Sequence, residues 1–104
     1  MSKNAKRFQQ GRSGRGHEGG LVIRRLAGEG VQVGDVMLRV IEVGRGRVRI
    51  AHGERVQFFS PGQALQIGAV RVRVLQCHEG SVRLLFSGPR EIPIWREEIA
   101  LLIA

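Results

Sequence analysis

Cysteine is almost absent from this 104-residue sequence, which contains only Cys77. A single cysteine cannot form an intramolecular disulfide or hold a structural zinc by itself, so we expect a small side chain facing the interior of a strand. Long apolar runs are missing as well. No stretch approaches the roughly 20 residues that a membrane-spanning helix needs, and the N-terminus lacks the apolar segment of a signal peptide. We therefore expect a cytoplasmic protein with no membrane partner.

The usual signs of catalysis are missing too. The three histidines, His17, His52 and His78, have no arrangement with Asp, Cys or Ser that is typical of a catalytic triad or a metal site. No Walker loop is present, and no GxGxxG motif opens a helix. The sequence predicts no enzymatic activity, no metal and no cofactor.

What the sequence has in abundance is positive charge, with 17 Lys and Arg against 9 Asp and Glu, a formal net charge of +8. Only Lys3 and Lys6 are lysines, so nearly all of this charge is arginine. Residues 1–20 carry five basic residues against Glu18, which leaves +4 for the remainder. We expect 1–20 to be a disordered basic Gly/Arg tail. Strong basicity favours a polyanionic partner such as nucleic acid, although charge also serves solubility.

From residue 21 onwards, short apolar runs of period two alternate with glycine-rich breaks, a pattern typical of strands joined by tight turns. The chain end departs from this pattern, because Arg96 to Ala104 contains good helix formers with Glu97 and Glu98 near the start. We expect an all-β fold, a small antiparallel sandwich or barrel, with a short C-terminal helix. The expected strands are Leu21–Ile23, Val31–Val33, Val36–Val43, Arg47–Ile50, Val56–Phe59, Ala64–Ile67, Val70–Leu75, Val82–Phe86 and Ile92–Trp95.

An internal repeat is the most informative pattern. Sliding the chain by 34 residues places Gly34–Ile50 over Gly68–Leu84 without a gap, with matching turn glycines and a matching Val-Arg pair. Chance similarity between β-rich segments is possible in principle, but the ungapped match favours duplication. We expect repeat 1 over about 21–54 and repeat 2 over about 55–104, each a β meander, packed face to face.

Arginines inside the expected strands alternate with apolar residues. In Arg47–Ile50 and in Arg71–Val74 the arginines share one face and the aliphatic side chains the other. A guanidinium-rich face suits phosphates and base edges. Charged residues on an exposed sheet also prevent aggregation, and composition alone does not decide between these interpretations.

Two segments of the sequence resemble the CsrA/RsmA family of bacterial translational regulators. Leu21–Asp35, LVIRRLAGEGVQVGD, is similar to the first strand of that family and the Gly-Asp turn that follows. Val82–Ile99, VRLLFSGPREIPIWREEI, contains Pro-Arg-Glu-Ile and Arg-Glu-Glu-Ile at the family spacing. The family is a homodimer that holds RNA between the first strand of one subunit and the last strand of the other.

Only repeat 1 has a recognisable first strand of the family, and only repeat 2 has its ending. The resemblance therefore implies a fused, pared-down pseudo-dimer that keeps one complete RNA site, with Leu21–Arg25 paired to Ile92–Arg96. Phe59 stands where the first-strand arginine of the second copy is expected, in agreement with loss of the other site.

Carried over residue by residue, the resemblance implies that Arg96 is the central RNA-contacting arginine and that Glu98 supports it. Trp95 replaces the family histidine and would be either a base-stacking platform or a core residue. The full set of RNA-binding residues implied in this way is Ile23, Arg24, Arg25, Gly88, Pro89, Arg90, Trp95, Arg96 and Glu98.

Our first hypothesis is an RNA-binding regulator of translation that recognises GGA-type hairpin loops in mRNA leaders, with small regulatory RNA as a further possible partner. The alternative is a protein-interaction β-module, or a degenerate CsrA-like antagonist without specific RNA binding. General single-strand binding through the tail is a third option. The chain could act as a monomeric pseudo-dimer or as a homodimer, and a protein antagonist is conceivable.

Overall fold

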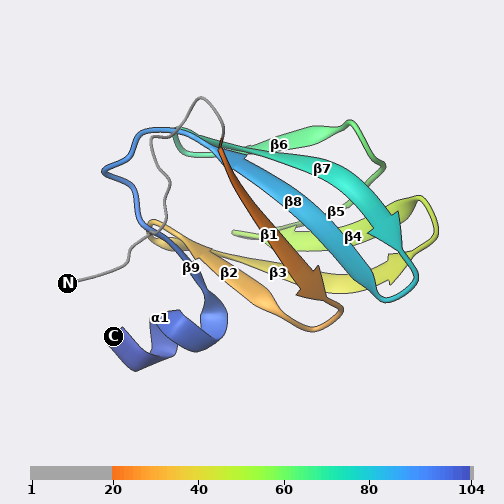
Figure 1. Ribbon diagram of the computed structural model, residues 1–104, viewed down its shortest axis with the longest axis horizontal. Coiled ribbons are helices and arrows are strands. Elements are labelled where there is room, and N and C mark those ends of the chain that lie inside the picture. The colour runs from red at the N-terminus through yellow and green to blue at the C-terminus, as the bar shows by residue number, and fades with distance from the viewer. Residues whose placement is uncertain (1–19, 104) are drawn as a thin grey trace.

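Two antiparallel sheets and one short helix make up the computed structural model, which describes residues 20–103 (Figure 1). One sheet, sheet A, has the strand order β1-β8-β7-β6, and the other, sheet B, has the order β5-β4-β3-β2-β9. The elements are β1 (Leu21–Leu26), β2 (Gly30–Val33), β3 (Val36–Gly44), β4 (Arg47–His52), β5 (Arg55–Phe59), β6 (Ala64–Ile67), β7 (Val70–His78), β8 (Ser81–Ser87), β9 (Ile94–Arg96) and α1 (Glu97–Ile103).

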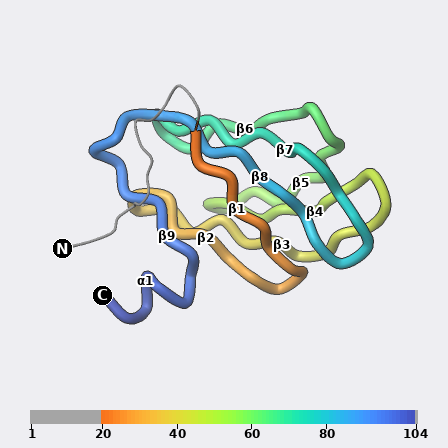
Figure 2. Tube along the Cα trace, viewed as in Figure 1, coloured from red at the N-terminus to blue at the C-terminus, as the bar shows by residue number. Residues whose placement is uncertain are grey.

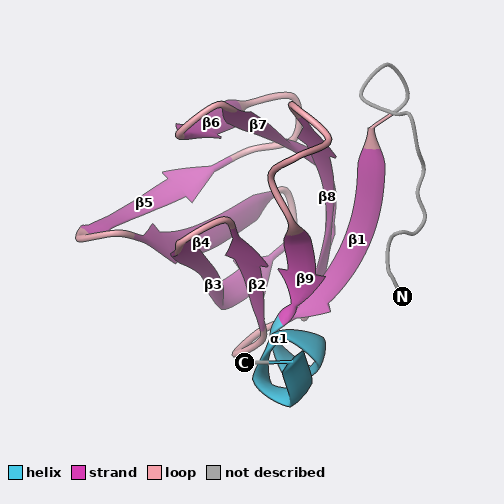
Figure 3. Ribbon diagram, turned by 90° about the vertical axis from the view of Figure 1, so that its left-hand side faces the viewer, coloured by secondary structure: helices cyan, strands magenta, loops and turns pink. Residues whose placement is uncertain are grey.

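The two halves of the chain exchange their first strands. β1 leaves the meander β2-β3-β4 that follows it and pairs with β8, whereas β5 pairs back with β4. β9, which comes last, adds to the free edge of β2. Each sheet thus contains strands from both halves, and the sheets face each other as a sandwich (Figure 3). The expected all-β fold with a short C-terminal helix is confirmed.

Segments 34 residues apart have the same local structure. The Gly28 N–H donates to Val40 O at 2.7 Å, and the Gly62 N–H donates to Val74 O at 2.7 Å. Both glycines have a positive φ, 92° and 93°, which strains any residue with a Cβ. A shift of strand register follows Val40 in β3 and Val74 in β7. The repeat seen in the sequence therefore extends to turns and bulges.

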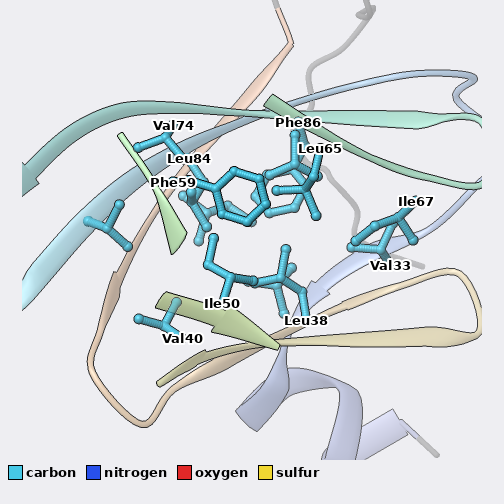
Figure 4. Close-up of a cluster of buried hydrophobic side chains, with 14 of the residues drawn as sticks. Val33, Leu38, Val40, Ile50, Phe59, Leu65, Ile67, Val74, Leu84 and Phe86 are labelled. Atoms are coloured by element: carbon cyan, nitrogen blue, oxygen red, sulfur yellow. The ribbon is translucent and has the colours of Figure 1, made fainter. Parts of the chain in front are cut away.

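The core lies between the two sheets and is built from the inward-facing residues of the period-two pattern (Figure 4). Phe86, Leu84 and Val74 contribute from sheet A, and Leu38 and Ile50 contribute from sheet B. Several of these side chains are completely buried, so the alternation of apolar and polar residues correctly predicted which residues form the core.

Cys77 in β7 is half-buried and packs against this core, as its sequence context predicted. Burial raises the pKa of its thiol, so at neutral pH the thiol stays protonated. Cys77 therefore behaves as a small packing residue.

β1 and β7 each continue three residues beyond their expected ends, and the last strand begins two residues later than expected. We expected it to span Ile92–Trp95, but β9 begins at Ile94. Proline has no N–H to donate to a ladder, and Pro93 instead accepts a hydrogen bond from the Gly34 N–H at 2.9 Å. The Ile92 N–H donates to Pro89 O in a turn. The segment before β9 is therefore a connection that crosses between the sheets (Figure 2).

Candidate nucleic-acid interface

The candidate site lies where an edge of sheet A comes near an edge of sheet B. β1 is the edge strand of sheet A, and β9 is the edge strand of sheet B. Figure 3 shows both strands on the same side of the sandwich, with α1 at their lower end. The chain thus brings together its first and last described strands, which are the two segments that carry the family resemblance.

Arg25 ties these two edges together. Its guanidinium donates to Glu98 Oε1 at 2.9 Å and to Glu98 Oε2 at 3.0 Å, a bidentate pair that links β1 to the first turn of α1. The same guanidinium donates to the carbonyls of Gly30 and Arg24, and its Nε lies 3.4 Å from a carboxylate oxygen of Glu29. Arg25 is only 5% exposed, so it positions the site and presents little surface to a ligand.

The partner of Glu98 therefore differs from our expectation that Glu98 supports Arg96. Glu98 forms its bidentate pair with Arg25, and the pKa of its carboxyl is lowered mainly by that hydrogen bond. Arg96 also stabilises the carboxylate, but more weakly, through its charge. The reason is geometric, because Arg25 points inward from β1 towards the start of the helix while Arg96 is exposed.

A second arginine fixes the other acidic residue of the helix start. Arg39 in β3 donates to both carboxylate oxygens of Glu97, at 3.0 and 2.7 Å, and to Gly28 O at 3.0 Å. These contacts lower the pKa of the Glu97 carboxyl. Gly30 lies next to Glu97, and a Cβ added at Gly30 would come within 3.1 Å of Glu97 Oε1. Two arginine–carboxylate pairs thus hold α1 and β9 in place.

Sequence reasoning missed Arg39 and Gly30 as positioning residues. Arg39 had been noticed only because it matches Arg73 in the repeat. Its partner Glu97 is 58 residues away in sequence, so no local spacing reveals the pair. The adjacent acids Glu97 and Glu98 were the available signal, since two carboxylates before an apolar run require nearby cations or solvent.

Three of the predicted site residues present free guanidinium groups. Arg24, Arg90 and Arg96 are exposed, and none of these side chains forms a hydrogen bond or an ion pair with residues 20–103. Arg24 is in β1, Arg90 lies in the connection before β9, and Arg96 ends β9. They are therefore available to bind an anionic ligand along this side of the sandwich.

The Gly88–Arg90 segment begins the crossing connection. Gly88 is half-buried, and a Cβ at this position would lie 3.0 Å from Ala69 O and 3.2 Å from Val70 Cα. Only glycine allows this approach to the turn between β6 and β7. Pro89 is exposed, like Arg90. The glycine sets the course of the connection, and the two residues after it are accessible.

Ile23 and Trp95 occupy different environments. Ile23 is 4% exposed and belongs to the core, so its side chain supports β1 from below. Trp95 pairs with Gln32 across β9 and β2, which puts it on the outer face of sheet B, where it is half-buried. Of the two interpretations of Trp95, a core position is excluded by its place outside the buried cluster.

The corresponding region on the other side of the sandwich is incomplete. β5 occupies the position in sheet B that β1 occupies in sheet A, and Phe59 stands in the place of Arg25. Phe59 is buried in the core, where it cannot bind a carboxylate. No strand among residues 20–103 covers the outer edge of β6 as β9 covers β2. The described chain therefore contains one such pairing of first and last strands.

Within residues 20–103, no group of three or more His, Cys, Asp or Glu side chains could hold a metal ion. In the same part of the chain, α1 is the only helix, and it is too short to cross a membrane.

The fold and the site define a class of protein. It is a small β-sandwich in which two meanders exchange strands and two arginine–carboxylate pairs hold a terminal helix. Residues 60–104 match the family model of CsrA, the global regulator protein family. The matched segment contains β6 to β9 and α1. Neither a curated protein nor a solved structure gives a match to the chain.

Proposed function

We propose that the protein is an RNA-binding post-transcriptional regulator that recognises GGA-bearing hairpin loops in mRNA leaders and thereby controls translation. The observation that most supports this proposal is the match of residues 60–104 to the CsrA family. That segment ends in β9 and α1, which Arg25 ties to β1 from the other end of the chain.

The chemistry of the site favours single-stranded RNA. A hairpin loop exposes base edges and phosphates that a regular A-form helix hides. Arg24, Arg90 and Arg96 offer planar guanidinium forks, which bind phosphate or the edge of guanine with two parallel hydrogen bonds. Backbone groups along the exposed edges of β1 and β9 add donors and acceptors. A loop bound there would hold the leader and restrict access of the ribosome.

A single chain would supply this site, since the proposed RNA contacts come from β1, the 88–90 segment and β9 of the same molecule. We therefore propose that the chain acts as a tandem unit, equivalent to two fused family subunits, with one RNA site.

Replacement of Arg96 by alanine tests the site. We expect Arg96→Ala to weaken binding of a GGA hairpin by about 1–3 kcal/mol, roughly 5- to 150-fold, because a direct base or phosphate contact is lost. Arg55→Ala is the matched control, since Arg55 is an exposed arginine on β5, the counterpart of β1. Fluorescence anisotropy at physiological salt measures both. Equal affinities for the two variants would contradict the proposed site.

A second candidate function, a protein-interaction module, is supported by the exposed apolar residues at the end of α1. Leu101, Leu102 and Ile103 are 72%, 79% and 57% exposed. Such residues suit a protein contact. Equal binding of GGA and scrambled hairpins, with a steep dependence on salt, would favour this candidate over specific RNA recognition.

A further inference from the structure

The outer faces of the two sheets differ in charge. The four strands of sheet A, β1, β6, β7 and β8, contain no Asp or Glu. Their outer face carries Arg24, Arg71, Arg73 and Arg83, all of them exposed. The side chains of these arginines form no hydrogen bond or ion pair with other residues in the described part of the chain. Sheet A thus presents four unneutralised guanidinium groups, which we call the arginine face.

The arginine face spans three adjacent strands. Arg24 in β1 is directly opposite Arg83 in β8. Arg71 and Arg73 follow in β7, the next strand of the sheet. Neighbouring strands are about 4.8 Å apart, so these positive charges extend over roughly 10 Å across the sheet. Like charges directly opposite each other destabilise a sheet, and a bound anion would remove that cost.

The internal repeat provides a comparison at equivalent positions. Arg39 and Arg49 in sheet B stand 34 residues before Arg73 and Arg83. Arg39 pairs with Glu97 at 2.7 Å, and Arg49 pairs with a glutamate across the strand at 3.2 Å.

That glutamate is Glu42, and the residue at its position in the second repeat is Gln76. Gln76 is paired with Arg83 in the same way that Glu42 is paired with Arg49. Arginines are therefore present at equivalent positions in both sheets, but only Arg39 and Arg49 of sheet B have acidic partners, Glu97 in α1 and Glu42 in β3. If arginine served only to keep exposed strands soluble, the two faces would not need to differ.

The face also lacks Phe, Tyr and Trp side chains. Phe86, which is buried, is the only Phe, Tyr or Trp in the strands of sheet A, and the exposed His78 lies at the very end of β7. Bases stack on exposed aromatic rings, whereas phosphates need only cationic forks. The chemistry of the face therefore suits a phosphodiester backbone more than bases. The nearest acids in sequence, Glu29 and Glu79, lie in the turns at the ends of the strands.

We propose that the arginine face binds the phosphate backbone of the RNA that flanks the loop, as a second contact surface distinct from the site between β1 and β9. This inference rests on the proposed RNA-binding function. Arg24 in β1 connects the two surfaces, because β1 is both the edge beside β9 and the first strand of the arginine face. Contacts of this kind strengthen binding and fix its direction without reading sequence.

Two variants at equivalent repeat positions test the proposal. Arg83→Gln and Arg49→Gln each remove one positive charge, one from the arginine face and one from an arginine of sheet B that is paired with Glu42. We expect Arg83→Gln to weaken binding several-fold and to reduce the slope of log affinity against log salt by about 0.7–1. The loss is the same for a GGA hairpin and for a hairpin with a scrambled loop. We expect Arg49→Gln to leave the affinity and the salt slope close to those of the parent.

The measurement is a salt titration of hairpin binding between roughly 50 and 200 mM salt with the full chain. Arg83→Lys keeps the charge and should retain the parent slope, while thermal unfolding confirms that each variant folds. Equal effects of Arg83→Gln and Arg49→Gln would overturn the proposal. The proposal would also be overturned if polyglutamate bound as tightly as RNA and its binding depended on Arg83 to the same extent. The face would then bind carboxylates as well as phosphates.

The two proposals fail in different ways. If the parent does not prefer the GGA hairpin but Arg83→Gln still weakens both RNAs more than Arg49→Gln does, specific recognition is wrong and the arginine face stands. If the parent prefers the GGA hairpin and both variants match it, the loop site stands and the arginine face is wrong.

Discussion

At the scale of single residues, the arginines of this chain divide into two groups according to burial and partner. Arg25 and Arg39 are held by carboxylates of α1 and fix the position of β9. Arg24 and Arg96 are exposed and have no such partner among the described residues. Whether an arginine of this chain can bind a ligand therefore depends on its position in the strand, which determines its exposure and its partner.

The pair between Arg25 and Glu98 predicts a dependence of stability on pH. The Arg25 guanidinium holds the pKa of the Glu98 carboxyl below its ordinary value. The stability that this pair contributes is complete above the glutamate pKa of the unfolded chain, about 4.3. It is lost as the pH falls further, through the lower pKa of the folded state. We expect Glu98→Gln to reduce the free energy of unfolding at pH 7 by about 1 kcal/mol, a figure discounted for the exposure of the carboxylate.

Chemical denaturation at several pH values measures this effect. The difference between Glu98→Gln and the parent should shrink as the pH falls below about 4.3. Glu54→Gln is the control, because Glu54 is exposed in the turn before β5 and forms no ion pair with the described residues. A constant difference between Glu98→Gln and the parent at every pH would show that the charge pair is not the cause.

At the scale of elements, β5 is stabilised by one of two adjacent phenylalanines. Phe59 is 8% exposed and packs in the core, whereas Phe58 is 48% exposed, with the Arg47 guanidinium 4.1 Å from its ring centre. The two residues differ in position along the strand and therefore in the face on which they lie.

We expect Phe59→Ala to reduce the free energy of unfolding by about 3–5 kcal/mol, because it leaves a cavity between the sheets. Phe58→Ala should cost about 1 kcal/mol or less, the value of an exposed cation–π contact. Thermal or urea unfolding of the two variants checks this difference. Similar losses for both would contradict the assignment of β5 to the edge of sheet B with Phe59 inward.

The period-two pattern and the turn glycines were sufficient to predict the strands, the helix and the inward-facing residues, because those depend on local sequence. The start of β9 was wrong by two residues, since the hydrogen bond from Gly34 to Pro93 comes from a distant turn. Arg25, the main partner of Glu98, was not predicted. Which arginine reaches a carboxylate depends on how two sheet edges meet, and periodicity contains no information on that.

At the scale of the whole molecule, the exchange of β1 and β5 lets one chain build both sheets and bring its first and last described strands together. The two surfaces that we propose for RNA, the β1–β9 site and the arginine face, share β1 and are therefore adjacent. A hairpin could contact both at once, with its loop at the site and its phosphates on the face.

Preference for a GGA loop is the central claim, and its most direct test is the ratio of affinities for two hairpins with the same stem. One has GGA in the loop, and the other has the same loop bases in scrambled order. Because a mismatched base typically costs about 1–3 kcal/mol, we expect the GGA hairpin to bind at least about tenfold more tightly at physiological salt. Equal affinities for the two hairpins would contradict specific recognition.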